Sequence, residues 1–250
     1  SAPASALRSS QWARLPATRG EIASLRDSFE QRFPDAKVRT LRGASATESA
    51  FRDHAPRLRW LHLATHGFFA PPELVSALGP DKTDAATAAR DSIGGLHPGL
   101  LSGLALAGAN RAADENRDDG ILTALEVSQL DLDRVELAVL SACETGLGRL
   151  AGGEGALGLQ RAFQVAGARS VVASLWAVDD EATRKLIERF YDNLWSKNLS
   201  KLEALSEAQR WMLRDGARRG IAPRGELNTD DPRALAPFYW APFVLSGDWR

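Results

Sequence analysis

Two residues whose side chains can do chemistry follow short apolar stretches of this sequence. His66 follows the stretch 60–65 and stands directly before Gly67, and Cys143 follows the apolar run 137–141 and opens a glycine-containing segment. An imidazole, whose ordinary pKa is about 6.5, suits the role of a general base at neutral pH. A cysteine thiolate is a strong nucleophile. If the fold brings the two side chains together, they predict covalent catalysis by a thiolate that the histidine activates.

Both residues also have a purely structural interpretation. Cys143 is the only cysteine of the chain, and unpaired cysteines are commonly small buried apolar residues. His66 could simply end a strand, and His62, which lies inside the same stretch, is expected to be structural. Whether His66 and Cys143 are catalytic or structural therefore depends on the elements that position their side chains.

Several short apolar stretches are predicted to be strands, and they cover residues 60–65, 101–106, 137–141 and 170–176. Continuous apolar runs of this length are typical of strands that a parallel sheet buries on both faces. Segments with helical periodicity lie between them, at residues 18–33, 155–165, 180–195 and 200–212. The alternation predicts an α/β fold, a mostly parallel sheet with helices on both faces.

The carboxyl ends of parallel strands lie along one edge of a sheet, where open α/β sheets place their ligands. His66, Cys143 and the pair Asp179 and Asp180 each come just after a predicted strand. We therefore expect these side chains to be neighbours in space although they are distant in sequence. This geometry is an independent reason to pair His66 with Cys143.

Local signals complete the predicted elements. Capping-box patterns that mark helix starts occur at Thr18 to Glu21, Ser45 to Glu48, Thr123 to Glu126 and Ser200 to Glu203. The alternating segment 37–41 and the aromatic segment 238–245 are predicted to be further strands. Either the segment 71–99 or the glycine-rich loop after Cys143 is predicted to be mobile and to gate the site, because neither shows a period.

Composition narrows the function further. The 250 residues, 44% of them hydrophobic, suffice for a sizeable core, and a net charge of −1 gives no bulk electrostatic reason to bind nucleic acid. A single cysteine excludes an intrachain disulfide and a cysteine-rich zinc site, and the acidic segment 111–120 lacks EF-hand spacing, so no metal is expected. The glycines at 153, 155 and 158 come too late after the strand to form a phosphate loop, so no cofactor is expected.

The compartment and the boundaries are also predicted from the sequence. No apolar run approaches the roughly 18–20 residues of a membrane span, and no signal-peptide pattern opens the chain. We expect a cytoplasmic protein that contacts no membrane. Residues 1–14 are expected to be a linker or the boundary with further sequence of a longer protein, and residues 15–250 a single domain.

Motifs in a fixed order resemble those of the CHAT domain, a caspase-like domain that often accompanies tetratricopeptide repeats and is related to caspases and separases. The matching motifs are Leu61 to Gly67, Val139 to Gly146, Gly152 to Gly155, Ser174 to Asp180 and Tyr239 to Asp248. The resemblance runs from about Leu15 to the end of the chain. It implies a caspase-like three-layer sandwich and, as a partner, an upstream tetratricopeptide or sensor module.

The resemblance also implies a mechanism at the matched positions. His66 would take the thiol proton or form an ion pair, and the Cys143 thiolate would attack a carbonyl of a protein or peptide substrate. The backbone N–H groups of Gly67 and Cys143 would face the oxyanion that develops. A glycine at position 67 leaves room for the substrate. No third member of a catalytic triad is evident in the sequence.

Cleavage specificity is predicted from the acidic residues near the same edge. Separases have an acidic residue after a similar Leu-Trp-x-Val stretch and cut after arginine, so we expect cleavage after a basic residue, Arg over Lys. Asp180 is the first choice for the pocket carboxylate, Asp179 the second and Glu154 the third. The local alternative is that Asp179 caps the helix beginning at Asp180.

Three classes of function remain open at this point. The first is a cysteine endopeptidase, which the His66 and Cys143 pair favours. The second is a catalytically silent interaction domain that keeps the fold, and the third is another cysteine-dependent hydrolase or acyl transferase.

Overall fold

A computed structural model describes residues 11–69, 98–111, 118–142, 154–176, 179–216 and 235–250 of the chain. Its main sheet contains four strands in the order β1-β5-β6-β7. These strands are β1 (Trp60–Ala64), β5 (Leu137–Ser141), β6 (Ser170–Ser174) and β7 (Phe243–Gly247). The pairs β1–β5 and β5–β6 are parallel, whereas β7 runs antiparallel to β6.

A second, antiparallel sheet has the strand order β2-β3-β4 and lies near the carboxyl end of β1. Its strands are β2 (His66–Phe69), β3 (Ser102–Ala105) and β4 (Ile121–Thr123). Only Thr65 separates β1 from β2, so His66 stands at the junction of the two sheets.

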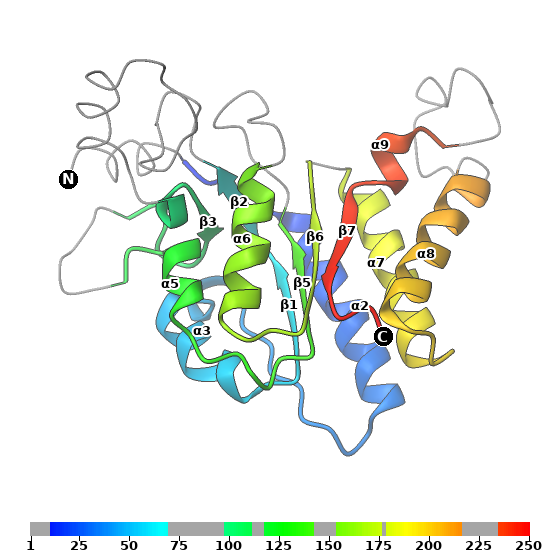
Figure 1. Ribbon diagram of the computed structural model, residues 1–250, viewed down its shortest axis with the longest axis horizontal. Coiled ribbons are helices and arrows are strands. Elements are labelled where there is room, and N and C mark those ends of the chain that lie inside the picture. The colour runs from blue at the N-terminus through cyan, green and yellow to red at the C-terminus, as the bar shows by residue number, and fades with distance from the viewer. Residues whose placement is uncertain (1–10, 70–97, 112–117, 143–153, 177–178, 217–234) are drawn as a thin grey trace, which may run out of the picture.

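Helices cover both faces of the main sheet and complete three layers (Figure 1). One layer contains α2 (Pro16–Arg32), α7 (Asp180–Trp195) and α8 (Lys201–Asp215). The other contains α3 (Glu48–His54), α5 (Ala124–Ser128) and α6 (Glu154–Val165). The short helix α9 (Pro237–Trp240) precedes β7. The predicted α/β sandwich with a mostly parallel sheet is confirmed.

Alternation along β5 shows why an unbroken apolar run was needed. Leu137 and Val139 belong to the core cluster that α2, α7 and α8 cover, whereas Ala138 and Leu140 belong to the cluster under α5 and α6. All five β5 residues are buried. A strand covered on both faces has no position where a polar side chain would reach water.

Most predicted elements are confirmed, and the errors are local. The segment 37–41 is not a strand, because its residues pair with no other strand in the described chain. In the segment 238–245 only the second half is a strand, and Pro237 opens a helical turn before it. Pro at the first position of a helix suits the fixed φ of proline.

Two of the four predicted capping boxes are confirmed and two are wrong. Those at Thr123 and Ser200 are present, each with both of its hydrogen bonds. The box at Thr18 is wrong, because α2 begins two residues earlier at Pro16 and Glu21 bonds elsewhere. The box at Ser45 is wrong as well, since Thr47 caps α3 and Glu48 is buried.

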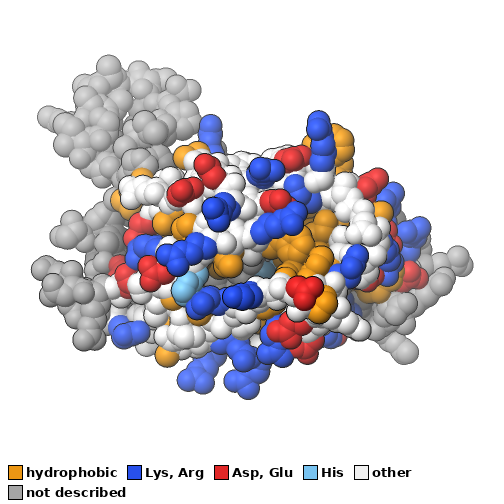
Figure 2. All heavy atoms as spheres, turned by 90° about the horizontal axis from the view of Figure 1, so that it is seen from below, with side chains coloured by type: hydrophobic (Ala, Val, Ile, Leu, Met, Phe, Trp, Pro, Cys, Tyr) orange, Lys and Arg blue, Asp and Glu red, His pale blue; other side chains and the backbone are white. Residues whose placement is uncertain are grey.

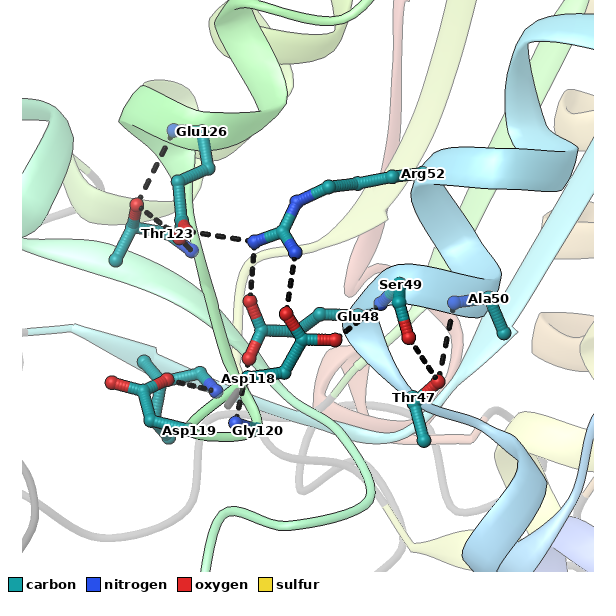
Figure 3. A network of polar contacts seen from close by, with 11 residues as sticks. Thr47, Glu48, Ser49, Ala50, Arg52, Asp118, Asp119, Gly120, Thr123 and Glu126 are labelled. Atoms are coloured by element: carbon teal, nitrogen blue, oxygen red, sulfur yellow. Dashed lines mark hydrogen bonds and ion pairs between the residues drawn. The ribbon is translucent and has the colours of Figure 1, made fainter. Parts of the chain in front are cut away.

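A polar network joins α3 to the turn before β4 (Figure 3). The guanidinium of Arg52 contacts carboxylates of Glu48 at 2.6 Å, Asp118 at 2.8 Å and Glu126 at 2.9 Å. Glu48 also accepts a hydrogen bond of 2.6 Å from the backbone N–H of Gly120. Burial raises the pKa of Glu48, with the neighbouring Glu126 carboxylate adding to the rise and the Gly120 N–H and Arg52 opposing it.

Gly120 is the residue that lets this turn close. Its φ is +82°, and a Cβ at this position would fall on the backbone of Ala109. The turn therefore needs glycine for both conformation and space. Through it, the network fixes β4 and so the small sheet that contains His66.

An aromatic cluster packs at the end of the main sheet where β1 begins, away from His66. Figure 2 views the molecule from this end. Trp60 and Trp195 stack with centroids 5.8 Å apart, and Phe29 and Phe33 meet them edge-on or tilted. This cluster ties the start of β1 to the ends of α2 and α7. Charged side chains surround the hydrophobic ones on this face (Figure 2).

We predict that Arg52→Met lowers the free energy of unfolding by about 2 kcal/mol, because it leaves the buried Glu48 carboxylate without its cation. Urea unfolding followed by circular dichroism measures this loss. Arg26→Met is the matched control and should leave stability unchanged, since Arg26 pairs with the exposed residues Asp27 and Glu30 in the described part of the chain. Equal stability of the two variants would contradict the role of the network.

Candidate active site

The two candidate catalytic residues follow two paired strands, β1 and β5. Ala64, the last residue of β1, is paired with Ser141, the last residue of β5, in the parallel ladder. His66 follows Ala64 by two positions, and Cys143 follows Ser141 by two positions. Cys143 itself lies outside the described residues.

Gly67 and Ala142 show how closely these strand ends approach. A Cβ added to Gly67 would lie 3.2 Å from the carbonyl oxygen of Ala142 and 3.5 Å from its Cβ. The Ala142 carbonyl also accepts a hydrogen bond of 3.2 Å from the hydroxyl of Ser174, the last residue of β6. Glycine at position 67 thus has a packing reason in addition to the predicted room for substrate.

His66 is buried and oriented by a backbone atom. Only 7% of the residue is exposed, and its Nε2–H donates a hydrogen bond of 2.6 Å to the carbonyl of Ala13. This contact assigns the proton of the neutral ring to Nε2 and makes Nδ1 the acceptor. Nδ1 is buried and has no hydrogen-bond partner among the residues that the structure describes. The His66 ring is therefore held by the hydrogen bond of Nε2, and Nδ1 is the nitrogen that can accept a proton.

Trp12 holds this N-terminal segment in place. Its backbone N–H donates to the side-chain oxygen of Asn110 at 2.8 Å, and its carbonyl accepts from the Asn110 amide at 2.9 Å. The indole packs against the ring of His66 with centroids 5.5 Å apart, and against Phe68 at 6.0 Å. Residues 12 and 13 thus form part of the histidine's surroundings.

A small hollow of about 30 Å³ opens beside His66. Its lining comes from α2 and the residue before it, from the ends of β1 and β5, and from the start of α7: Leu15, Ala17, Thr18, Glu21, Thr65, His66, Ser141, Asp180 and Thr183. The structure therefore brings His66 and Asp180 to one place, as the shared edge of the sheet predicted.

Asp179 and Asp180, at the start of α7, have different roles. Asp179 is the N-cap, and its carboxylate accepts from the backbone N–H groups of Glu181 and Ala182, each at 3.0 Å. Asp180 is not used in the cap and lines the hollow. Its pKa is raised by partial burial, by the Asp179 carboxylate and by Glu21, and His66 opposes the rise.

Glu154 begins α6, but its side chain is outside the described part of the chain. The same holds for the glycine-rich loop after Cys143 and for the segment 71–97, so the predicted gate falls outside the description. Within the described ranges, no group of three or more His, Cys, Asp or Glu side chains could hold a metal ion.

Two groups at this site were not predicted from the sequence, the carboxylate of Glu21 and the backbone carbonyl of Ala13. Glu21 was assigned to a capping box, yet it is buried and its Oε1 lies 2.8 Å from Nε2 of His62. The carbonyl of Ala13 was not considered, since a backbone atom has no signature in the sequence. For Glu21 a signal existed, because the position lies on the apolar face of α2 near Leu25.

The chain matches the sequence profile of the CHAT domain over residues 1–248. It belongs to the CHAT domain family. Among curated proteins it is similar to tetratricopeptide repeat protein 28 of Mus musculus, at 28% identity over 174 residues, and to the Homo sapiens protein of the same name at 29%. These alignments cover 67% of this chain and 7% of each relative, so the chain spans a small part of the length of those proteins.

Membership in this family supports the caspase-like architecture of the CHAT domain. Both relatives are named for tetratricopeptide repeats. None of the described helices of this chain is long and apolar enough to cross a bilayer.

We predict that Trp12→Ala increases the rate at which diethylpyrocarbonate modifies His66 several-fold, because the indole no longer covers the ring. Peptide mapping by mass spectrometry measures modification of each histidine separately. Trp249→Ala is the control, since Trp249 is 53% exposed and lies near the carboxyl terminus. An unchanged rate at His66 in Trp12→Ala would show that Trp12 does not shield this residue.

Proposed function

We propose that this CHAT domain is a cysteine endopeptidase in which Cys143 is the nucleophile and His66 the general base. The observation that supports the proposal most strongly is the parallel register of β1 and β5, together with the close approach of Gly67 to Ala142. These contacts bring the residue next to His66 against the residue next to Cys143. The family supplies the caspase-like context.

The orientation of His66 suits the proposed role. With Nε2–H bound to the Ala13 carbonyl, Nδ1 is the nitrogen that can accept the thiol proton. The thiolate then attacks the peptide carbonyl, and the C–N bond breaks as the imidazolium returns the proton to the leaving amine. Water, deprotonated by the same nitrogen, hydrolyses the thioester and regenerates the thiol. The Ala13 carbonyl keeps the ring in this orientation and stabilises the imidazolium.

Backbone N–H groups are the proposed oxyanion donors. The proposed donors are those of Gly67 and Cys143, and each such donor contributes roughly 2.7–4 kcal/mol of transition-state stabilisation. Because Gly67 presses against Ala142, a larger residue at 67 would displace the strand end that carries Cys143.

Asp180 is the proposed determinant of cleavage after a basic residue. It lines the hollow beside His66, whereas the Asp179 carboxylate is occupied by the helix cap. A carboxylate in this position can bind a guanidinium through two parallel hydrogen bonds. Arg is therefore preferred to Lys, and Asp179 and Glu154 are weaker candidates.

We predict that His66→Ala lowers kcat/KM on fluorogenic peptides by about two to four orders of magnitude, since it removes the general base. Cys143→Ala should abolish turnover. His54→Ala is the matched control, because His54 lies at the end of α3, where its ring contacts Arg39, and it should retain full activity. Normal circular dichroism with full activity in Cys143→Ala or His66→Ala would refute the dyad.

We predict that peptides ending in Arg are cleaved faster than those ending in Lys, and that a peptide ending in Asp is not cleaved. Asp180→Ala should lower kcat/KM for the Arg peptide by about tenfold or more, the loss of a charge-assisted hydrogen bond. Asp179→Ala should act mainly on stability through the lost cap. Preferential cleavage after Asp would refute an acidic pocket, and an Arg rate unchanged in both variants would direct attention to Glu154.

The two other classes of function are outcomes of the same experiments. Turnover of esters or amides without peptide cleavage would identify another cysteine-dependent hydrolase or acyl transferase. Absence of any turnover, with unchanged partner binding in Cys143→Ala, would identify an interaction domain.

A further inference from the structure

The hollow beside His66 contains a second carboxylate that the proposed dyad does not use. We propose that Glu21, together with Asp180, forms a two-carboxylate subsite that binds the guanidinium of the arginine before the cleaved bond. This inference rests on the proposed peptidase function and names a further specificity-determining residue for it. Glu21 lies on α2 and Asp180 at the start of α7, and both line the hollow with His66.

Glu21 is held rigidly at the base of this hollow. The residue is 4% exposed, and its Oε1 accepts a hydrogen bond of 2.8 Å from Nε2 of His62. The other nitrogen of His62, Nδ1, lies 3.1 Å from the hydroxyl of Tyr191. The imidazole can satisfy both contacts, with Nε2–H donating to Glu21 and Nδ1 accepting from the Tyr191 O–H. The chain of hydrogen bonds thus orients the Glu21 carboxylate.

The Glu21 carboxylate raises the pKa of two neighbouring groups. Burial raises the pKa of Tyr191 well above its ordinary value, and the Glu21 carboxylate raises it further. The pKa of Asp180 is raised by burial, by Asp179 and also by Glu21. Within the described ranges, no Lys or Arg forms an ion pair with either Glu21 or Asp180. Apart from the contact of Glu21 with His62, the two carboxylates at this hollow can therefore bind a cation from outside the described chain.

Buried atoms without partners point to the same hollow. Thr183 is 4% exposed and lines the hollow, and its hydroxyl has no hydrogen-bond partner among the residues described. Burying a hydroxyl unpaired is costly, so such a group usually has a partner in the working state. A guanidinium offers five N–H donors in a planar fork, enough for two carboxylates and a hydroxyl.

The exposure of the two carboxylates is consistent with an arginine side chain that enters the hollow from the surface. Asp180 is exposed, whereas Glu21 is buried, so the first lies at the mouth and the second at the base. The hollow of about 30 Å³ holds roughly one water molecule, which is less than an arginine side chain needs. The lining of the hollow must therefore move apart when the side chain enters.

Glu21→Gln tests the proposal, because it removes the charge, keeps the shape and still accepts from His62. Wild type should cleave an Arg peptide much faster than the citrulline peptide, its neutral isostere. Glu21→Gln should reduce this Arg-to-citrulline ratio of kcat/KM by roughly tenfold or more, the effect of a charge-assisted contact. Tyr191→Phe is the matched control, because it perturbs the same hydrogen-bond chain but leaves the carboxylate, and it should keep the ratio. An unchanged ratio in Glu21→Gln would overturn the proposal.

A binding measurement separates this proposal from peptidase activity. Agmatine, which carries the guanidinium of arginine, is titrated into Cys143→Ala by calorimetry, and into the same protein with Glu21→Gln or Tyr191→Phe added. We expect binding that Glu21→Gln weakens by roughly tenfold and Tyr191→Phe preserves. Binding that Glu21→Gln leaves unchanged, or no binding at all, would overturn the subsite. Binding with this pattern in a protein that cleaves no peptide would refute the proposed function and leave the subsite standing.

Discussion

The parallel hydrogen-bond ladder between β1 and β5 is the constraint on which the site depends. It pairs Ala64 with Ser141, and this pairing fixes where the chain emerges from each strand. A slip of one residue would turn every side chain of β5 to the opposite core, because successive side chains face opposite sides. Since both faces are buried, such a slip would be costly. The register is therefore determined by packing, and the approach of Gly67 to Ala142 follows from it.

Elements outside this ladder complete the surroundings of His66. The small antiparallel sheet begins at His66 itself, and the network around Arg52 fixes the turn that leads into it. The N-terminal segment adds the carbonyl of Ala13, which orients the imidazole. In the proposed mechanism this carbonyl would orient the imidazole as a carboxylate does in Ser-His-Asp triads. The absence of a third acidic or amide partner from the sequence motifs is consistent with this arrangement.

Much of the fold could be predicted because hydrophobic burial and local caps determine it. The run at Leu137–Ser141 is a strand with the predicted bounds, and the capping boxes at Thr123 and Ser200 act within one turn of their helices. Both signals depend on neighbours in the sequence or on simple periodicity. The convergence of His66 and Asp180 could be predicted for a related reason, since parallel strands end at one edge.

The errors arose where distant residues outcompete local ones. Glu21 has the spacing of a capping box, but its partner is His62, 41 positions away, and the burial of both is decided by packing of α2 on the sheet. The alternating segment 37–41 has the period of a strand but no strand to pair with in the described chain. The carbonyl of Ala13 has no side-chain signature at all. A sequence pattern states what a segment can do locally, and tertiary contacts decide which of these options is used.

The central claim is that His66 activates Cys143, and labelling of the single cysteine tests it most directly. A peptidyl acyloxymethyl ketone ending in arginine reacts with an activated thiolate, and intact mass spectrometry counts the adducts. With one cysteine in the chain, any thiol adduct maps to Cys143. We predict one adduct in the wild-type protein and in His54→Ala, and none over the same time in His66→Ala. Equal labelling of His66→Ala and wild type, or no labelling of the folded wild-type protein, would contradict the account.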